Sequence, residues 1–144
     1  MTDRAIRYTT SLDGIGVAEL AGGFWVGWPI PPTPEEHLDL LEGSEAVVLA
    51  VDDATERVVG FVTAVGDGVL SAYLPLLEVL PAWQGQGIGS ELVRRVLAEL
   101  DPRYMVDLVC DEDLVPFYER LGFMPYRAML RRDRSAVGRA RGSS

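Results

Sequence analysis

A glycine-rich stretch, Gln84–Ser90, is the part of the sequence best suited to holding an anion. It lies between an apolar, strand-like run and a helical pattern, so the first N–H groups of that helix lack partners and carry the positive end of the helix dipole. Glycines at alternate positions, Gly85, Gly87 and Gly89, remove the side chains that would keep an anion away. The stretch therefore predicts a phosphate or diphosphate site.

Two common nucleotide-binding motifs do not match this stretch. A P-loop requires Gly-Lys-Ser/Thr, and the sequence contains no lysine. The Rossmann fingerprint requires G-x-G-x-x-G, whereas the spacing here is G-x-G-x-G. The anion is therefore expected to belong to another class of ligand.

An acidic residue, Glu78, stands in an otherwise apolar run from Leu74 to Leu80. A carboxylate that faces the interior without a partner has a raised pKa and can accept a proton near neutral pH. Glu78 is therefore a candidate general base or substrate-binding group. The alternatives are that its side chain points to solvent or makes a structural hydrogen bond.

Tryptophan, histidine and cysteine are three other residue types that can take part in binding or catalysis. Trp25 and Trp28 lie in a loop rich in Gly, Pro and aromatic residues, and aromatic faces suit a cationic or aryl amine. The alternative is that this loop packs its aromatic rings onto the sheet. His37 is expected to be exposed on the polar side of a helix. Cys110 is expected to be a small buried hydrophobic residue rather than a nucleophile.

These residues need a scaffold of alternating elements. The pattern predicts strands at 6–10, 45–52, 57–65, 69–80 and 104–110, helices at 13–22, 33–43, 87–100 and 111–121, and a last extended segment at 123–130. Thr33, Pro34 and Glu36 form a capping box with proline at the first helical position. Pro75 indicates a bulge or an edge. The fold class is mixed α/β, with one parallel strand pair across the helix at 87–100.

Composition narrows the class of protein. The chain has 144 residues, of which 48% are hydrophobic, and one cysteine, which excludes a disulfide scaffold or a cysteine-based metal cluster. We expect one domain at 1–130 and a mobile, arginine-rich tail at 131–144. The net charge of −9 argues against nucleic-acid binding, and it either serves solubility or attracts a cationic small molecule. Since no signal core or membrane-length apolar run is visible, a cytoplasmic protein is expected.

Two motifs carry a resemblance to a known family. The segment Val79–Val93 resembles the acyl-CoA signature of the GNAT superfamily of N-acetyltransferases, whose pattern Gln/Arg-x-x-Gly-x-Gly/Ala is met by Gln84, Gly87 and Gly89. The segment Val115–Phe123 is similar to the second motif, a tyrosine followed four residues later by Gly-Phe. The resemblance covers residues 45–125 well.

The resemblance implies a mostly antiparallel mixed sheet with a splayed strand pair, flanking helices, and acetyl-CoA as co-substrate. The amides of Gly85, Gln86, Gly87, Ile88, Gly89 and Ser90 would hold the CoA diphosphate, bordered by Gln84. The backbone of Leu77, Glu78 and Val79 would pair with pantetheine, and a backbone N–H near Val79 would stabilise the oxyanion. Where the family often has asparagine, this sequence has Asp111, which accepts but does not donate hydrogen bonds.

The resemblance also implies roles in catalysis. Tyr118 would be the general acid toward the departing thiolate, and Trp25 and Trp28 would form part of the acceptor wall. Glu78, chosen above for its place in an apolar strand, is the candidate base for the amine. The expected function is direct acetyl transfer to a primary amine of a small molecule, without nucleic acid, membrane or metal. The alternatives are an acyl-CoA sensor without catalysis and an enzyme acting on a protein N-terminus or lysine. A homodimer is expected by analogy.

Overall fold

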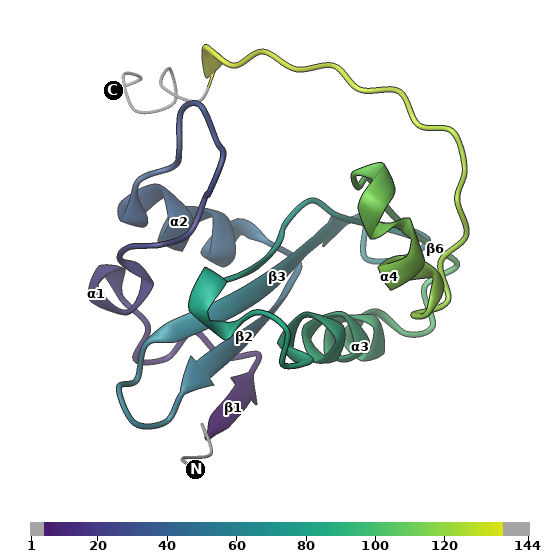
Figure 1. Cartoon of the computed structure of the whole chain (residues 1–144). Helices are drawn as coiled ribbons and strands as arrows, with labels where there is room; N and C mark the ends of the chain where they lie inside the picture. The colour runs from purple at the N-terminus through teal and green to yellow at the C-terminus, as the bar shows by residue number, and fades with distance from the viewer. Residues whose placement is uncertain (1–4, 137–144) are drawn as a thin grey trace.

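Six strands form the central sheet of the computed structural model, which describes residues 5–136 (Figure 1). The strands are β1 (Ile6–Thr9), β2 (Ala46–Asp52), β3 (Val58–Gly66), β4 (Ser71–Leu74), β5 (Leu77–Val79) and β6 (Met105–Leu108). The order is β1-β2-β3-β4-β6, and β5 pairs with β3. Only the β4–β6 pair is parallel. The predicted mixed, mostly antiparallel sheet is confirmed.

Helices cover both faces of this sheet (Figure 1). They are α1 (Val17–Leu20), α2 (Pro34–Gly43), α3 (Ile88–Leu100) and α4 (Val115–Glu119), with short 3-10 turns η1 (Pro81–Trp83) and η2 (Glu112–Leu114). The apolar side of α3 packs on one face, and α1 and α2 cover the other. No helix within residues 5–136 is both long and apolar enough to cross a membrane.

The start of α2 has the predicted capping box. The Thr33 hydroxyl accepts a hydrogen bond from the Glu36 N–H at 3.1 Å, and the Glu36 carboxylate accepts one from the Thr33 N–H at 2.9 Å. Pro34 occupies the first turn, where its missing N–H costs no hydrogen bond. These contacts fix where α2 begins and hence where the preceding loop ends.

A bulge at Pro75 divides the predicted strand 69–80 into β4 and β5. Val65 of β3 pairs with Tyr73, but two residues earlier the Thr63 N–H donates a hydrogen bond of 3.1 Å to the Leu76 carbonyl, so Thr63 lies opposite Leu76. The β4 side therefore holds one extra residue, which is the definition of a bulge. After the bulge, β5 pairs only with β3, so the strand separates from β6.

Other predicted elements also differ from the structure, and the helix predicted at 111–121 is the short turn η2 followed by α4. The helix predicted at 13–22 is only the single turn α1, because Gly14 has a left-handed φ of +78° and the helix cannot extend N-terminal to its cap at Gly16. The segment 123–130, predicted as extended, joins no strand within the described residues. Of the predicted tail at 131–144, residues 137–144 lie outside the described part of the chain.

The prediction that His37 is exposed is wrong. Its side chain is fully buried on the inner face of α2, one turn before Leu41. Its ring lies 4.4 Å from that of Phe61, 5.0 Å from that of Trp25 and 5.3 Å from that of Phe24, measured between centroids. Neither ring nitrogen has a hydrogen-bond partner within residues 5–136. Burial lowers the pKa of His37 to about 4, so the imidazole is neutral at pH 7.

We expect replacement of His37 by leucine to flatten the pH dependence of stability in mild acid. The unfolded chain binds a proton at His37 near pH 6.5, whereas the folded chain does so only near pH 4, so stability falls as the pH drops between these values. The resulting loss between pH 7.5 and 5 is about 2 kcal/mol. Urea unfolding of both proteins at the two pH values measures it. An equal pH dependence in the two proteins would contradict this role for His37.

Candidate functional site

The start of α3 presents several unpaired backbone donors. Its N-cap, Gly87, has a φ of +81° and provides no side-chain cap. The first helical hydrogen bond runs from the Glu91 N–H to the Gly87 carbonyl at 3.1 Å. Within the described residues, the N–H groups of Ile88, Gly89 and Ser90 therefore have no partner. Together with the helix dipole they favour an anion at this position.

The loop before α3 leaves room for that anion. A Cβ atom added at Gly85 or Gly87 would meet no atom within 4 Å, and both glycines have a left-handed φ, +78° and +81°. The Gln84 side-chain amide donates a hydrogen bond to the Val79 carbonyl at 3.0 Å, which ties the loop to β5. The residues present thus fit a diphosphate group, since they form an open cradle of main-chain donors.

The outer edge of β5 is the next part of the site. Hydrogen bonds from the Thr63 N–H to the Leu76 carbonyl and from the Leu80 N–H to the Val59 carbonyl fix the register with β3. Because hydrogen-bonded positions alternate along an antiparallel pair, the main-chain groups of Leu77 and Val79 point away from β3. They face the side on which β6 has separated. This edge can pair with an extended ligand, as predicted for pantetheine.

Glu78 lies between these two residues, and its side chain contacts the loop that contains the two tryptophans. Its Oε1 accepts a hydrogen bond of 2.8 Å from the Trp25 N–H. Trp25 has a φ of +71°, which is unusual for a residue other than glycine, and this bond helps hold it there. Burial raises the pKa of Glu78, and the Trp25 hydrogen bond opposes that rise. The interpretation of Glu78 as a structural acceptor is confirmed for this oxygen. No local sequence signal indicates a contact across 53 positions.

The two tryptophans have different environments. Trp25 is 7% exposed and packs against His37 and Phe61. For Trp25, this matches the alternative given above, that the loop packs its aromatic rings onto the sheet. Trp28 is 42% exposed and lies edge-on to Trp25, with 5.1 Å between the ring centroids. Trp28 is therefore the one of the two whose face is available to a ligand.

Tyr118 lies on α4, next to the start of α3. The ring of its neighbour Phe117 comes within 3.5 Å of the position of a Cβ atom at Gly89, so the two helices are in contact. The Tyr118 ring packs edge-on against Phe117 and Phe123, with 4.9 and 5.7 Å between centroids. Burial, and to a smaller degree Cys110, raises the pKa of Tyr118 to about 12, so the phenol keeps its proton at neutral pH.

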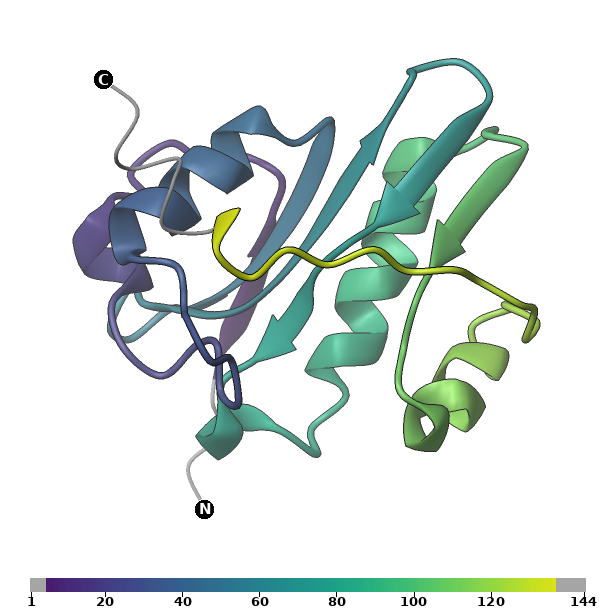
Figure 2. The ribbon, with the colours of Figure 1, turned by 90° about the horizontal axis from the view of Figure 1, so that it is seen from above.

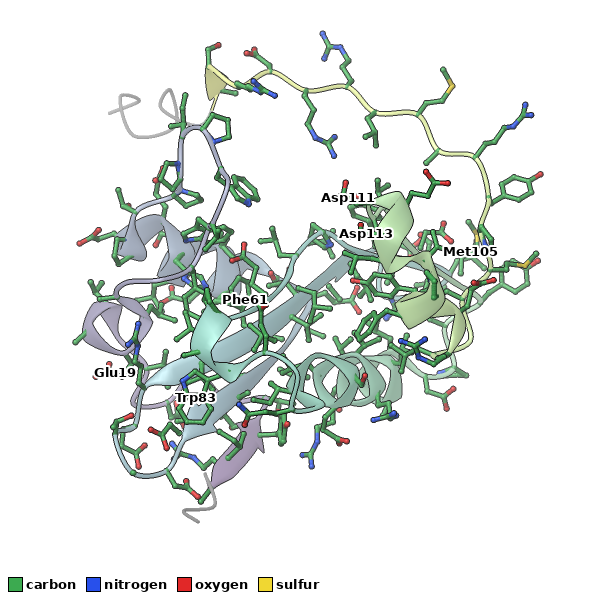
Figure 3. The ribbon with its side chains drawn as sticks, viewed as in Figure 1. Glu19, Phe61, Trp83, Met105, Asp111 and Asp113 are labelled. Atoms are coloured by element: carbon green, nitrogen blue, oxygen red, sulfur yellow. The ribbon has the colours of Figure 1, made fainter. Side chains whose placement is uncertain are left out.

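Two further predicted residues lie between the end of β6 and the start of η2. Cys110 follows the end of β6 by two residues and is half-buried, and burial raises its pKa, which disfavours the nucleophilic thiolate. Asp111 is exposed at the start of η2, and its side chain makes no cap there. Figure 3 shows Asp111 with Asp113 at the corner before α4, across the molecule from Trp83. The predicted contact of Asp111 with pantetheine stays a prediction.

Comparison with known proteins identifies the family. Residues 15–123 match the acetyltransferase (GNAT) family. A crystal structure assigned as an acetyltransferase from Deinococcus radiodurans R1 is 50% identical, with a TM-score of 0.88 over 94% of this chain and 95% of that one. A GNAT family acetyltransferase from Brucella melitensis, solved with acetyl-CoA, is 22% identical, with a TM-score of 0.63 over 86% of each chain.

Among curated sequences, serotonin N-acetyltransferase 2 (chloroplastic) of Oryza sativa subsp. japonica is 36% identical over 65% of this chain and 49% of its own length. The chain spans about three fifths or less of the length of the curated relatives it matches. The family match nevertheless covers most of the chain and contains both motifs and the splayed strand. The chain belongs to the GNAT family of acetyltransferases, whose co-substrate is acetyl-CoA.

Proposed function

We propose that this protein transfers an acetyl group directly from acetyl-CoA to the primary amine of a small molecule. One observation carries the proposal: the unpaired N–H groups at the start of α3 lie next to the open edge of β5, with Glu78 on that strand. A diphosphate held at the start of α3 directs the rest of an extended ligand along the open edge of β5.

The main chain does the binding in this proposal. The amides of residues 85–90 hold the diphosphate, and Gln84 borders it while bonded to Val79. The outward main-chain groups of Leu77, together with the Val79 carbonyl that also accepts from Gln84, pair with the amides of the pantetheine arm. The outward Val79 N–H is proposed to donate to the oxygen of the reacting carbonyl. A donor fixed in a strand stabilises the developing negative charge without having to reorganise.

Glu78 is proposed to accept the proton of the amine, directly or through one water molecule. An alkylamine with a pKa of about 10 is mostly protonated at neutral pH and must lose a proton to attack. Oε1 is bonded to the Trp25 N–H, and the second carboxylate oxygen has no such bond within the described residues. The base therefore also positions the loop that contains Trp28.

Tyr118 is proposed to donate to the departing sulfur. A phenol with a pKa near 12 is a stable hydrogen-bond donor at neutral pH, and it favours the thiolate over the thioester because only the thiolate carries a full charge. After the amine has lost its first proton and attacked, its nitrogen gives up one more proton as the amide forms and the leaving thiolate takes up one, so neutral amine and thioester become amide and thiol. Tyr118 therefore acts mainly by donating a hydrogen bond to the thiolate, and transfer of its proton is the lesser of its two roles.

The acceptor that we propose is a small cationic amine, a class that includes amines carrying an aryl group. Trp28 offers an exposed aromatic face, and the net charge of −9 attracts cations. The name of the rice relative, a serotonin N-acetyltransferase, supports an arylalkylamine as the first compound to test. A cytoplasmic location also stays a prediction.

Replacing Ser90 by aspartate tests the diphosphate site. A carboxylate in the first turn of α3 complements the helix dipole, so we expect stability to stay constant or rise by about 0.5 kcal/mol. The same charge repels the diphosphate, so CoA affinity should fall about tenfold or more. Ser90→Asn is the neutral control of nearly equal size. Calorimetric titration with CoA and thermal unfolding of each variant measure the two effects. Unchanged CoA affinity in Ser90→Asp would contradict the assignment.

The proposed activity is tested by thiol release from acetyl-CoA in the presence of a panel of amines. We expect turnover with at least one small primary amine, and none with a peptide N-terminus or a lysine peptide at equal concentration. CoA binding without turnover on any amine would favour an acyl-CoA sensor. Turnover restricted to peptides would replace the proposed acceptor class.

A further inference from the structure

The segment 124–132 has the sequence pattern of a strand but lies outside the sheet. One side carries only apolar residues, Met124, Tyr126, Ala128 and Leu130, and the other carries two basic residues among apolar ones, Pro125, Arg127, Met129 and Arg131. Tyr126 is 92% exposed and Met129 98%. Within residues 5–136, the backbone of this segment has no hydrogen bond to any strand. Such an arrangement leaves both apolar surface and main-chain groups without partners.

The course of this segment takes it away from β6 of its own chain. Its start is fixed, because the Phe123 N–H donates to the Tyr118 carbonyl at 3.1 Å. From there, Figure 1 shows it arching from α4 toward the side of α2, and Figure 2 shows it crossing in front of the strands. A cavity of about 910 Å³ lies between the segment and β6.

The strand β6 has an unpaired edge of its own. It pairs on one side with β4, where the Met105 N–H donates to the Leu70 carbonyl at 3.0 Å. Because alternate residues point to opposite sides, the main-chain groups of Val106 and Leu108 face away from β4. No strand within the described residues covers that edge. It is a template for one more strand.

The charges of the two unpaired elements are complementary. Arg127, Arg131 and Arg132 form no ion pair with any of residues 5–136. The corner formed by β6, η2 and α4 is acidic, with Asp107, Asp111, Glu112, Asp113 and Glu119. Asp107 and all three of these arginines line the same cavity. A strand added to β6 is therefore expected to be basic, as segment 124–132 is.

We propose that segment 124–132 adds as a strand to β6 of a second copy of this chain, and that the second copy does the same in return. The exchange is closed and two-fold, so it stops at a dimer. It pairs the free edge, covers the exposed apolar residues and matches basic with acidic side chains. Since Tyr118 lines the same cavity, the partner's segment would border the tyrosine proposed to act on the thioester.

The first test is the oligomeric state of the full chain and of three variants by sedimentation velocity. We expect a dimer for the unchanged chain. Ala128→Pro and Met129→Pro remove neighbouring N–H groups that point to opposite sides, so one of them must break the new ladder and weaken the dimer at least tenfold. Ala128→Val keeps its N–H group and favours a strand, so its dimer should persist. A monomeric full chain, or a dimer that both prolines leave intact, would overturn the proposal.

A charge exchange then distinguishes pairing between chains from pairing within one chain. Asp107→Arg makes the β6 edge repel a basic segment, and the double change Arg127→Asp with Arg131→Asp makes the segment repel an acidic edge. Each protein alone should be monomeric, whereas an equal mixture of the two, carrying tags of different mass, should form a heterodimer. Absence of a heterodimer in the mixture, or protection of amides 124–132 from hydrogen exchange in a monomer, would overturn the exchange. These readouts do not involve acetyl transfer.

Discussion

Replacing Tyr118 by phenylalanine is expected to lower kcat for acetyl transfer by about 10²-fold or more, with CoA affinity within about twofold of the unchanged protein. The ring packing against Phe117 and Phe123 does not require the hydroxyl, so the fold should be kept. What is lost is a donor that stays protonated at neutral pH, because burial raises the pKa of Tyr118 to about 12. Thiol release at saturating substrates measures kcat, and calorimetry measures CoA affinity.

The matched control is Tyr73→Phe, since Tyr73 is another half-buried tyrosine that lines the cavity shared with Tyr118. Its kcat should stay within about twofold of the unchanged protein. A Tyr118→Phe enzyme with full kcat would remove Tyr118 from the chemistry and leave it a packing residue. A loss that appears only in CoA affinity would assign it to binding instead.

Replacing Glu78 by glutamine is expected to reduce kcat about 100-fold or more and to abolish the acidic limb of its pH profile. Glutamine still offers an oxygen to the Trp25 N–H, so the loop should keep its position while the proton acceptor is lost. A base must be ionised, so the rate falls as the pH drops through its pKa. Burial raises that pKa above the usual 4.5, so the limb should lie above pH 4.5.

Two control variants separate this role from others. Glu78→Ala removes both the base and the Trp25 hydrogen bond, so it should also raise KM for the amine, whereas Glu78→Gln should change KM little. Glu112→Gln, which changes the same residue type on the exposed turn η2, should leave the profile unchanged. An acidic limb that persists in Glu78→Gln would show that another group, such as the amine itself, sets it.

Local signals in the sequence were sufficient to predict much of the fold. The capping box of Thr33 and Glu36 fixes α2 because both partners lie within one turn. Pro75 marks the bulge because proline cannot donate to the ladder, and the strand does divide there. The GNAT motifs predicted the junction before α3 because the glycine spacing and the following helical period are both local.

What could not be predicted depends on distant residues. The environment of His37 is decided by Phe61 and Trp25, which lie on other elements. The polar residues next to His37 in the sequence therefore indicated the exposed face of the helix, which is the wrong face. The hydrogen bond from Trp25 to Glu78 joins a loop to a strand 53 positions away. Segment 123–130 has the pattern of a strand and is predicted to be extended, but a pattern does not identify the neighbour with which a strand pairs, and here it joins no strand within the described residues.

The most direct test of the account is a crystal structure of the protein grown with CoA. We predict that the diphosphate oxygens lie within hydrogen-bond distance of the N–H groups of residues 87–90, and that the pantetheine arm follows the outer edge of Leu77 and Val79. A crystal in which CoA is bound elsewhere, with the start of α3 filled by protein side chains, would contradict the account.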